Sequence, residues 1–206
     1  MMLKNNFTTL LLNYTNDTGK VEKYWHELET AYSHSKRKYH NLSHLENMFE
    51  ELEEVKDKVE DQDTIVFAIF YHDIIYNVLK GNNEAKSAAI AVERLSDIGL
   101  DSLITTKCKE HILATKHHVM TSSNDTNILI DIDMSILGKE WSIYEKYMSD
   151  VRSEYSIYPD FVYNKGRKNA LIHFLDNNVF LTPYFYEKYE KQAIRNIKRE
   201  IEILRK

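Results

Sequence analysis

An apolar run in the middle of the chain, residues 65–75 (IVFAIFYHDII), carries an imidazole and a carboxylate side by side at His72 and Asp73. Such a run is typical of the core, where a polar group needs a hydrogen-bond partner and a charge needs a counter-charge or a metal. The chain must therefore fold so that other polar residues reach this segment. Two polar clusters offer them, YHNLSH at 39–44 and DIDMS at 131–135.

Few residues in this chain can end a helix, because 206 residues include only 5 Gly and 2 Pro. This scarcity favours long helices with short connections, and hence an all-α fold. The segment 64–79 is apolar all round, as a central helix would be; Asn82 or Asn83 could cap the next helix, and Gly99 could end it. Hydrophobic spacing predicts helices at 20–34, 44–58, 64–79, 84–97, 103–118, 127–137, 140–157 and 166–178, and a last helix after Thr182-Pro183.

The formal net charge of -5 offers no general electrostatic attraction to nucleic acid, so nucleic-acid binding is not expected. A single cysteine, Cys108, excludes an intramolecular disulfide framework and suits a reducing compartment. No apolar run approaches transmembrane length, and residues 1–14 lack the apolar core and cleavage site of a signal peptide. We therefore expect a cytoplasmic protein that does not bind a membrane, and its oligomeric state stays open.

The DIDMS cluster contains two aspartates, which helix geometry separates. At about 100° per residue, the apolar residues fall on one side of the predicted helix: Leu129, Ile132, Ile136 and Leu137. Asp133 lies within that apolar cluster, whereas Asp131 projects about 160° away and is expected to face water. A carboxylate on an apolar face needs a strong partner, so Asp133 is the metal candidate.

The order His, His-Asp, Asp, with its surroundings, resembles the HD superfamily of metal-dependent phosphohydrolases, which is named after its adjacent His-Asp ligands. Successive blocks of an uncharacterised bacterial subfamily are similar to RKYHNLSHL, FAIFYHDIIYN, NNEAKSA, ILATKHH, DIDMSILG, VRSEYSIY, NKGRKNAL and AIRNIKREIEIL, which together cover about residues 20–206. The resemblance implies an HD-domain helical bundle that forms one domain of residues 1–206. Its metal-binding core would span about residues 36–140, and a helical extension would follow over about residues 140–206.

For the metal, the resemblance implies one divalent ion bound by His44, His72, Asp73 and Asp133. Two imidazoles and two carboxylates suit Mn, Fe, Co, Ni, Zn or Mg, with no thiolate to select a soft metal. A bound ion can lower the pKa of a water and withdraw charge from a phosphoryl oxygen, as hydrolysis of a phosphate ester requires. The structural alternative is that His72 and Asp73 bond each other at a helix junction, which leaves His44 and Asp133 unexplained.

The block YHNLSH is similar to a stretch of the cyclic-nucleotide phosphodiesterases in which the first His donates a proton to the leaving group and the second binds metal. That similarity assigns proton donation to His40 and metal binding to His44. Asn41 could cap the helix that His44 begins, which leaves His40 outside the helix and free to reach the cleft. The alternative is that His40 is simply exposed to solvent.

Further catalytic candidates are Asp73 itself, Glu84, His117 and Arg37. Glu84 and Arg37 could face the cleft; otherwise Glu84 is an acid favoured at a helix start and Arg37 a surface cation. His117 is a candidate contact to a substrate phosphate or a water. His111 lies six residues earlier, about 240° around the helix, so a second metal held by both is possible but disfavoured.

Two classes of function follow from these residues. The first is an enzyme that hydrolyses a phosphate mono- or diester of a nucleotide or another small phosphorylated metabolite. The second is a non-catalytic module that keeps the metal in order to bind or sense a nucleotide. The complete set of four predicted ligands favours the enzyme. Its substrate and native metal stay open, and Arg152 and Arg167 could be substrate contacts or members of buried ion pairs.

Overall fold

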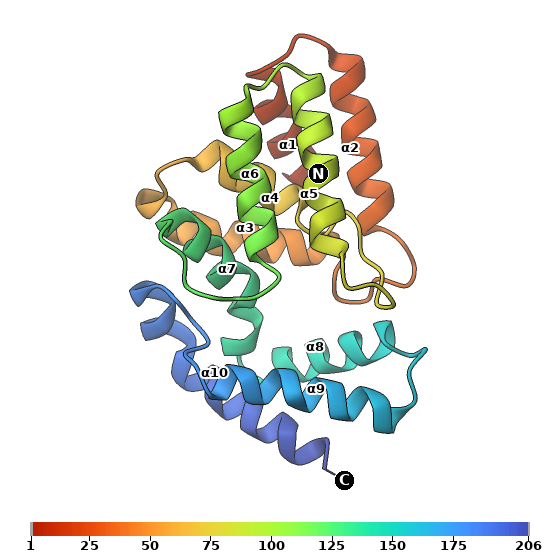
Figure 1. Ribbon diagram of the computed structural model, residues 1–206, viewed down its shortest axis with the longest axis vertical. Helices are drawn as coiled ribbons and strands as arrows, with labels where there is room; N and C mark the ends of the chain where they lie inside the picture. Colours follow the sequence, from red (N-terminus) through yellow and green to blue (C-terminus); the bar gives the residue numbers. More distant parts are fainter. Residues whose placement is uncertain (1, 206) are drawn as a thin grey trace. The chain divides into compact units, whose positions relative to one another are not determined.

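The computed structural model describes residues 2–205, and this part of the chain contains helices but no β-strand (Figure 1). The predicted all-α fold is confirmed. None of the described helices is both long enough and apolar enough to cross a membrane. The α-helices are α1 (Met2–Leu12), α2 (Thr18–Tyr32), α3 (Leu42–Val55), α4 (Gln62–Tyr71), α5 (Asn83–Asp97), α6 (Ser102–Ala114), α7 (Asn124–Met134), α8 (Trp141–Glu154), α9 (Asp160–Leu175) and α10 (Pro183–Ile203), and two short 3₁₀-helices are η1 (Lys56–Lys58) and η2 (Ser135–Gly138).

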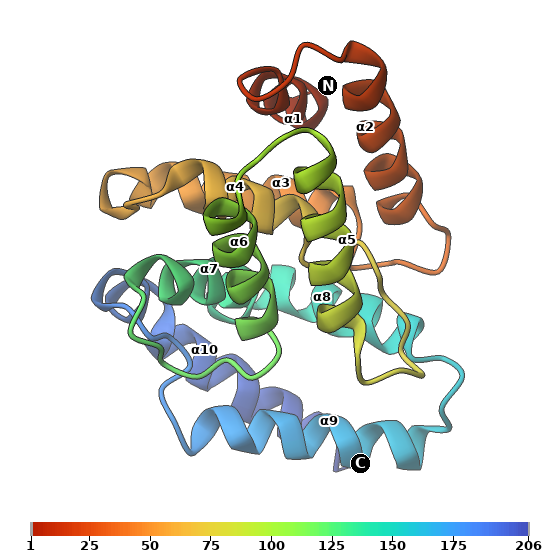
Figure 2. The same ribbon diagram turned by 45° about the horizontal axis from the view of Figure 1, so that its top comes forward.

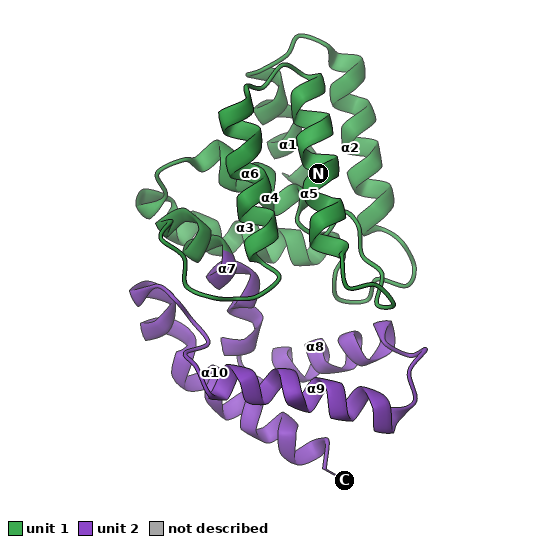
Figure 3. Cartoon of the chain, in the orientation of Figure 1, with its two compact units in different colours: residues 1–129 green, residues 130–206 purple. Residues whose placement is uncertain are grey.

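The chain divides into two compact units, residues 1–129 (unit 1) and residues 130–206 (unit 2), which Figure 3 colours separately. The boundary falls inside α7, so this helix gives its first residues to unit 1 and its last residues to unit 2. The prediction of one HD-type domain over residues 1–206 remains a prediction.

Helix α4 forms the centre of unit 1 because almost all of its residues are apolar. The side chains that it buries include Ile65, Phe67, Ala68, Ile69, Phe70 and Tyr71. Helix α6 packs against both α4 and α5, and Figure 2 shows α5 and α6 side by side. Most of the surface of α4 is thus buried, as the all-round apolar sequence predicts.

Helix α1 is an addition to the predicted helices. It buries Leu3, Phe7, Leu10 and Leu11, which lie at helical spacing. The Phe7 ring meets the Phe70 ring of α4 edge-on, with 5.0 Å between ring centroids. The spacing of these apolar residues is visible in the sequence, and it was the available signal for this helix.

The predicted helix 64–79 is wrong at its C-terminal end, because α4 ends at Tyr71. The backbone N–H groups beyond this point find partners outside the helix. Asp73 N donates to Tyr32 Oη (3.2 Å), and Ile75 N donates to Ser87 Oγ (3.1 Å). The His-Asp pair therefore lies at the end of a buried helix, where residues from other elements can reach it.

The ends of α5 and α6 show where turn residues decide the boundary. Asn82 occupies the N-cap position of α5, although its side chain caps no N–H group, and Gly99 follows the helix with a φ of 91°. Glycine adopts this left-handed backbone without strain. Helix α6 ends at Ala114 rather than at 118, and beyond it Lys116 N and His117 N donate to the Leu113 and Ala114 carbonyls in turns.

Unit 2 is built from the end of α7, η2 and helices α8 to α10. Helix α9 begins at Asp160, earlier than the predicted residue 166, whereas α10 begins at Pro183 after Thr182, as predicted. The close approach of η2 to α10 requires Gly138, because a Cβ at this position would overlap the Tyr189 side chain. The fully buried residues of this unit include Tyr144, Leu171, Phe185, Ala193 and Ile197.

Candidate metal centre

His44 is placed by the start of helix α3. The Asn41 side chain caps this helix, because Asn41 Oδ1 accepts from Ser43 N (2.9 Å) and from His44 N (3.4 Å). The predicted cap is therefore confirmed, and it leaves His40 outside the helix. His44 lies in the first turn, where its side chain is buried with 2% exposure.

His72 directly follows α4, and the backbone fixes the orientation of its ring. Its Nδ1 lies 2.9 Å from the Ile69 carbonyl oxygen. A carbonyl can only accept a hydrogen bond, so Nδ1 is the donor, and Nε2 is the ring nitrogen that could bind a metal. Bonding of a histidine to a backbone carbonyl through one nitrogen is how proteins orient the other nitrogen toward a metal.

The two imidazoles point their Nε2 atoms at each other. These atoms lie 3.3 Å apart, and both rings are buried. Two nitrogen ligands about 2.1 Å from one ion lie roughly 3.0 to 3.4 Å apart in octahedral or tetrahedral geometry. The separation of His44 Nε2 and His72 Nε2 therefore fits a shared divalent ion as well as a single N–H···N hydrogen bond.

Asp133 supplies the carboxylate of this group. One ligand atom from each of His44, His72 and Asp133 lies within 4.8 Å of the others, so the three side chains could hold a metal ion. Helix α7, which carries Asp133, is anchored in unit 1 at its start, because the Asp125 carboxylate accepts from Glu60 N and Asp61 N (2.9 Å each). Asp133 follows on the same continuous helix.

The predicted exposure of Asp131 is wrong. Asp131 is fully buried and accepts three hydrogen bonds, from Leu181 N (2.7 Å), Thr182 N (2.7 Å) and Thr182 Oγ1 (2.6 Å). Burial raises the pKa of this carboxyl to about 6, and the hydrogen bonds from Thr182 and Leu181 oppose the rise. Asp131 thus holds the segment before α10 through two backbone N–H groups and the Thr182 hydroxyl. Asp133 is the aspartate that lies with His44 and His72 in the group that could hold a metal ion.

Asp73 and His40 lie beside this group. Asp73 Oδ2 is 3.5 Å from His72 Nε2 and 4.0 Å from His40 Nε2. Their side chains are partly exposed, Asp73 by 17% and His40 by 21%, whereas that of His72 is exposed by only 2%. The structure therefore brings His40, His72 and Asp73 together. A metal-ligand role for Asp73 and a catalytic role for His40 stay predictions.

The remaining catalytic candidates lie on three different segments. Arg37 donates to the backbone carbonyls of His40, Asp73 and Ile74. Glu84 lies in the first turn of α5, and its Oε2 is 4.0 Å from Lys116 Nζ. His117 follows the end of α6 and is exposed. Roles for Arg37, Glu84 and His117 in catalysis remain predictions.

His111 has a partner of its own within unit 1. It is buried in α6, and its Nδ1 lies 2.8 Å from Thr126 Oγ1. Burial lowers the pKa of His111, against the opposing effect of Asp125, so the neutral ring is favoured. His111 is therefore tied to the start of α7.

The two arginines whose roles the sequence left open both form ion pairs in unit 2. Arg167 Nε donates to Glu200 Oε1 (2.7 Å), and the side chains of this pair are exposed by only 12% and 1%. Arg152 Nη2 donates to Asp160 Oδ1 (2.6 Å) in a more exposed pair. Arg167 thus forms a buried ion pair, whereas Arg152 forms an ion pair at the surface.

Sequence reasoning missed two tyrosines that contact this site. Tyr32 Oη accepts from Asp73 N, and the Tyr76 ring stacks on the His40 ring with 4.3 Å between centroids. Tyr76 follows the His-Asp pair closely in the sequence, and this proximity was the available signal. No local pattern could have revealed Tyr32, which comes from the end of α2.

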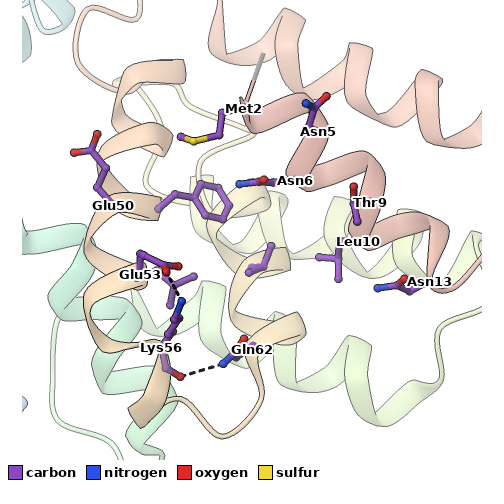
Figure 4. Close-up of a pocket in the computed structure, with 13 residues that line it drawn as sticks. Met2, Asn5, Asn6, Thr9, Leu10, Asn13, Glu50, Glu53, Lys56 and Gln62 are labelled. Atoms are coloured by element: carbon purple, nitrogen blue, oxygen red, sulfur yellow. Dashed lines mark hydrogen bonds and ion pairs between the residues drawn. The ribbon is translucent and has the colours of Figure 1, made fainter.

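A separate surface cavity of about 750 Å³ lies in unit 1 between α1 and the α3–α4 pair (Figure 4). Helix α1 lines it with Asn5, Asn6, Thr9 and Asn13, and Figure 4 shows Lys56 opposite, bonded to Glu53 and to Gln62. The residues that line this cavity include none of the candidate ligands or catalytic residues. The cavity is therefore distinct from the candidate metal centre.

Comparison with known proteins assigns no family to the chain. No family model matches it, and neither the curated proteins nor the solved structures give a match. The similarity of its sequence blocks to the HD superfamily remains a prediction.

Proposed function

We propose that this protein is a metal-dependent phosphohydrolase that cleaves a phosphate ester of a nucleotide or another small phosphorylated metabolite. The observation that carries the proposal is the convergence of His44, His72 and Asp133, whose ligand atoms lie within 4.8 Å of one another. Two of these side chains are buried histidines, which is unusual unless a partner compensates their burial.

The donor set indicates which ions would bind. Imidazole and carboxylate groups suit Mn, Fe, Co, Ni, Zn and Mg, and the single cysteine of the chain, Cys108, is buried elsewhere in α6. His44 Nε2, His72 Nε2 and an oxygen of Asp133 would hold the ion, with Asp73 as the predicted fourth ligand. When bound, the ion supplies Lewis-acid chemistry: it withdraws charge from a phosphoryl oxygen and lowers the pKa of a water.

The chain's own residues provide the proton transfer. His40 lies outside α3, and its partial exposure leaves the imidazole within reach of a ligand. In our proposal His40 gives a proton from Nδ1 to the leaving-group oxygen, and Asp73 Oδ2, 4.0 Å from Nε2, orients the ring through its other nitrogen. Arrangement of a histidine by a neighbouring carboxylate is a common way to set its tautomer.

The charge of the chain favours a small substrate. With a net charge of -5, the protein as a whole does not attract a polyanion, so an anionic ligand would depend on the ion and a few nearby groups. We place the protein in the cytoplasm, a compartment that suits its single buried cysteine. A partner nucleic acid or membrane is not part of the proposal.

The test is a metal-reconstitution assay. Purified protein is stripped with a chelator, reloaded separately with Mn, Co, Ni, Zn or Mg, and incubated with p-nitrophenyl phosphate, bis(p-nitrophenyl) phosphate, nucleotides and cyclic dinucleotides. We expect metal-dependent phosphate or phosphomonoester release that His44→Ala and Asp133→Ala abolish. The exposed His26 of α2 provides the matched control, because His26→Gln removes an imidazole that is neither a candidate ligand nor a catalytic candidate and should keep full activity.

Two outcomes would overturn the proposal. Failure of every metal to bind would leave His44 and His72 as a hydrogen-bonded structural pair. Metal-dependent nucleotide binding with no turnover of any ester would point to a binding or sensing module instead. Calorimetric titration of metal and of nucleotide, run beside the activity assay, separates these results.

A further inference from the structure

Arg37 joins the two segments that carry His40 and Asp73. Its Nη1 donates to the Asp73 carbonyl (2.6 Å) and to the His40 carbonyl (3.3 Å), and its Nη2 donates to the Ile74 carbonyl (2.8 Å). The guanidinium therefore bridges the segment before α3 and the segment after α4. Three of the five N–H donors of the guanidinium thus bond backbone carbonyls.

Aromatic rings extend this bridge to the His40 side chain. The guanidinium carbon of Arg37 lies 4.9 Å from the Tyr32 ring centroid and 5.5 Å from that of Tyr76. Tyr76 in turn stacks on His40, with 4.3 Å between ring centroids and 27° between ring planes. Tyr32 also accepts from Asp73 N, so both polar backbone atoms of Asp73 are bonded to this assembly.

We propose that Arg37 is a positioning residue, which holds His40 against Asp73 through backbone hydrogen bonds and through the Tyr76 ring. The inference rests on the proposed function in that it gives His40 its task, but the geometric claim can be tested without activity. It also changes the role expected for Arg37 from the sequence, because the residue acts through His40 and Asp73 and does not bind the substrate phosphate.

Arginine suits this position better than lysine. A planar guanidinium can donate to several carbonyls at fixed angles while its faces lie against aromatic rings. An ammonium group at the end of a flexible stem can replace the charge but not the fork. Arg37→Lys should therefore keep the charge and lose the geometry, which separates positioning from electrostatic attraction of an anionic substrate.

The experiment combines proton NMR of the metal-free protein with steady-state kinetics at saturating metal. In the wild type, the Tyr76 ring current should shift the His40 ring protons upfield, and His40→Gln identifies these signals. In Arg37→Lys we expect the shift to diminish and kcat to fall by about 10 to 100-fold, as when an outer-shell partner is lost, with KM within about twofold. Tyr76→Leu should give the same two effects while it leaves the carbonyl bonds of Arg37 in place.

Arg94 offers a matched control in the same unit. Its guanidinium donates to Glu27 (2.7 Å) and lies 5.5 Å from the Tyr24 ring, so Arg94→Lys makes the same chemical change away from the site. It should leave the His40 signals and kcat unchanged. A higher KM at constant kcat in Arg37→Lys would overturn the proposal in favour of direct substrate binding, as would unchanged His40 signals and kcat. If the wild type hydrolyses no ester, the proposed function fails, and the NMR result alone decides the positioning claim.

Discussion

Alanine substitution of Asp131 and Asp133 should separate stability from metal binding, although the two residues are only two positions apart on α7. Asp131 is fully buried and accepts three hydrogen bonds from Leu181 and Thr182. Asp133 is partly exposed and belongs to the group with His44 and His72. We expect Asp131→Ala to destabilise the protein and Asp133→Ala to abolish metal binding.

The magnitudes follow from these contacts. Hydrogen bonds to an ionised acceptor contribute about 1.5 to 3 kcal/mol each, and a buried donor left without a partner costs about 1 to 3 kcal/mol. Part of this is offset because the carboxylate of Asp131 is itself costly to bury, as its raised pKa shows. We therefore expect Asp131→Ala to lower the free energy of unfolding by about 3 to 5 kcal/mol, in the range for removal of one member of a buried pair. Asp131→Asn keeps one acceptor oxygen and should lose less.

The assay is urea unfolding at neutral pH, with and without Mn²⁺. For the wild type, free metal at 100 times its Kd should raise the free energy of unfolding by about 2.7 kcal/mol. Asp133→Ala should match the metal-free wild type within about 1 kcal/mol and show no increase with metal. The reasoning is refuted if Asp133→Ala keeps the increase, or if Asp131→Ala is as stable as the wild type.

Three further outcomes follow from the described contacts. His40→Ala should lower turnover and leave metal content intact, whereas His44→Ala should lose the metal; equal metal loss by mass spectrometry would show that their roles are wrongly assigned. Arg167→Met should lower the free energy of unfolding by about 3 to 5 kcal/mol, because it leaves the buried Glu200 carboxylate without its guanidinium partner. Chemical denaturation measures this change, and a value below about 1 kcal/mol would contradict the prediction. Burial lowers the pKa of His111 below its ordinary 6.5, so the unfolded chain binds more protons in acid than the folded protein does. The free energy of unfolding should therefore be highest above about pH 6.5 and decrease as the pH falls through that value. Urea titrations at several pH values should show a smaller decrease for His111→Gln.

Local sequence features predicted the fold class and most of the helices. The scarcity of Gly and Pro indicated helices throughout, Asn41 was recognised as a cap, and Thr182-Pro183 marked the start of α10. These predictions succeed because caps and turn formers act through bonds within a few residues. The predicted cap at Asn41 also places the start of the helix that carries His44.

The errors concern contacts between distant segments. The end of α4 at Tyr71 depends on bonds from Tyr32 and Ser87, which no local pattern reveals. Asp131 was assigned to solvent because its angle on the helix points away from the apolar cluster. That angle says nothing about which other segment covers the opposite face, and the backbone before α10 covers it.

Binding of one divalent ion by His44, His72 and Asp133 can be observed by anomalous X-ray diffraction from crystals grown with Zn²⁺ or Mn²⁺. We expect one strong anomalous peak about 2.0 to 2.3 Å from His44 Nε2, His72 Nε2 and an oxygen of Asp133. A protein that binds no ion at these residues, or a peak that lies on other side chains while the two histidines hydrogen-bond each other, would contradict this expectation.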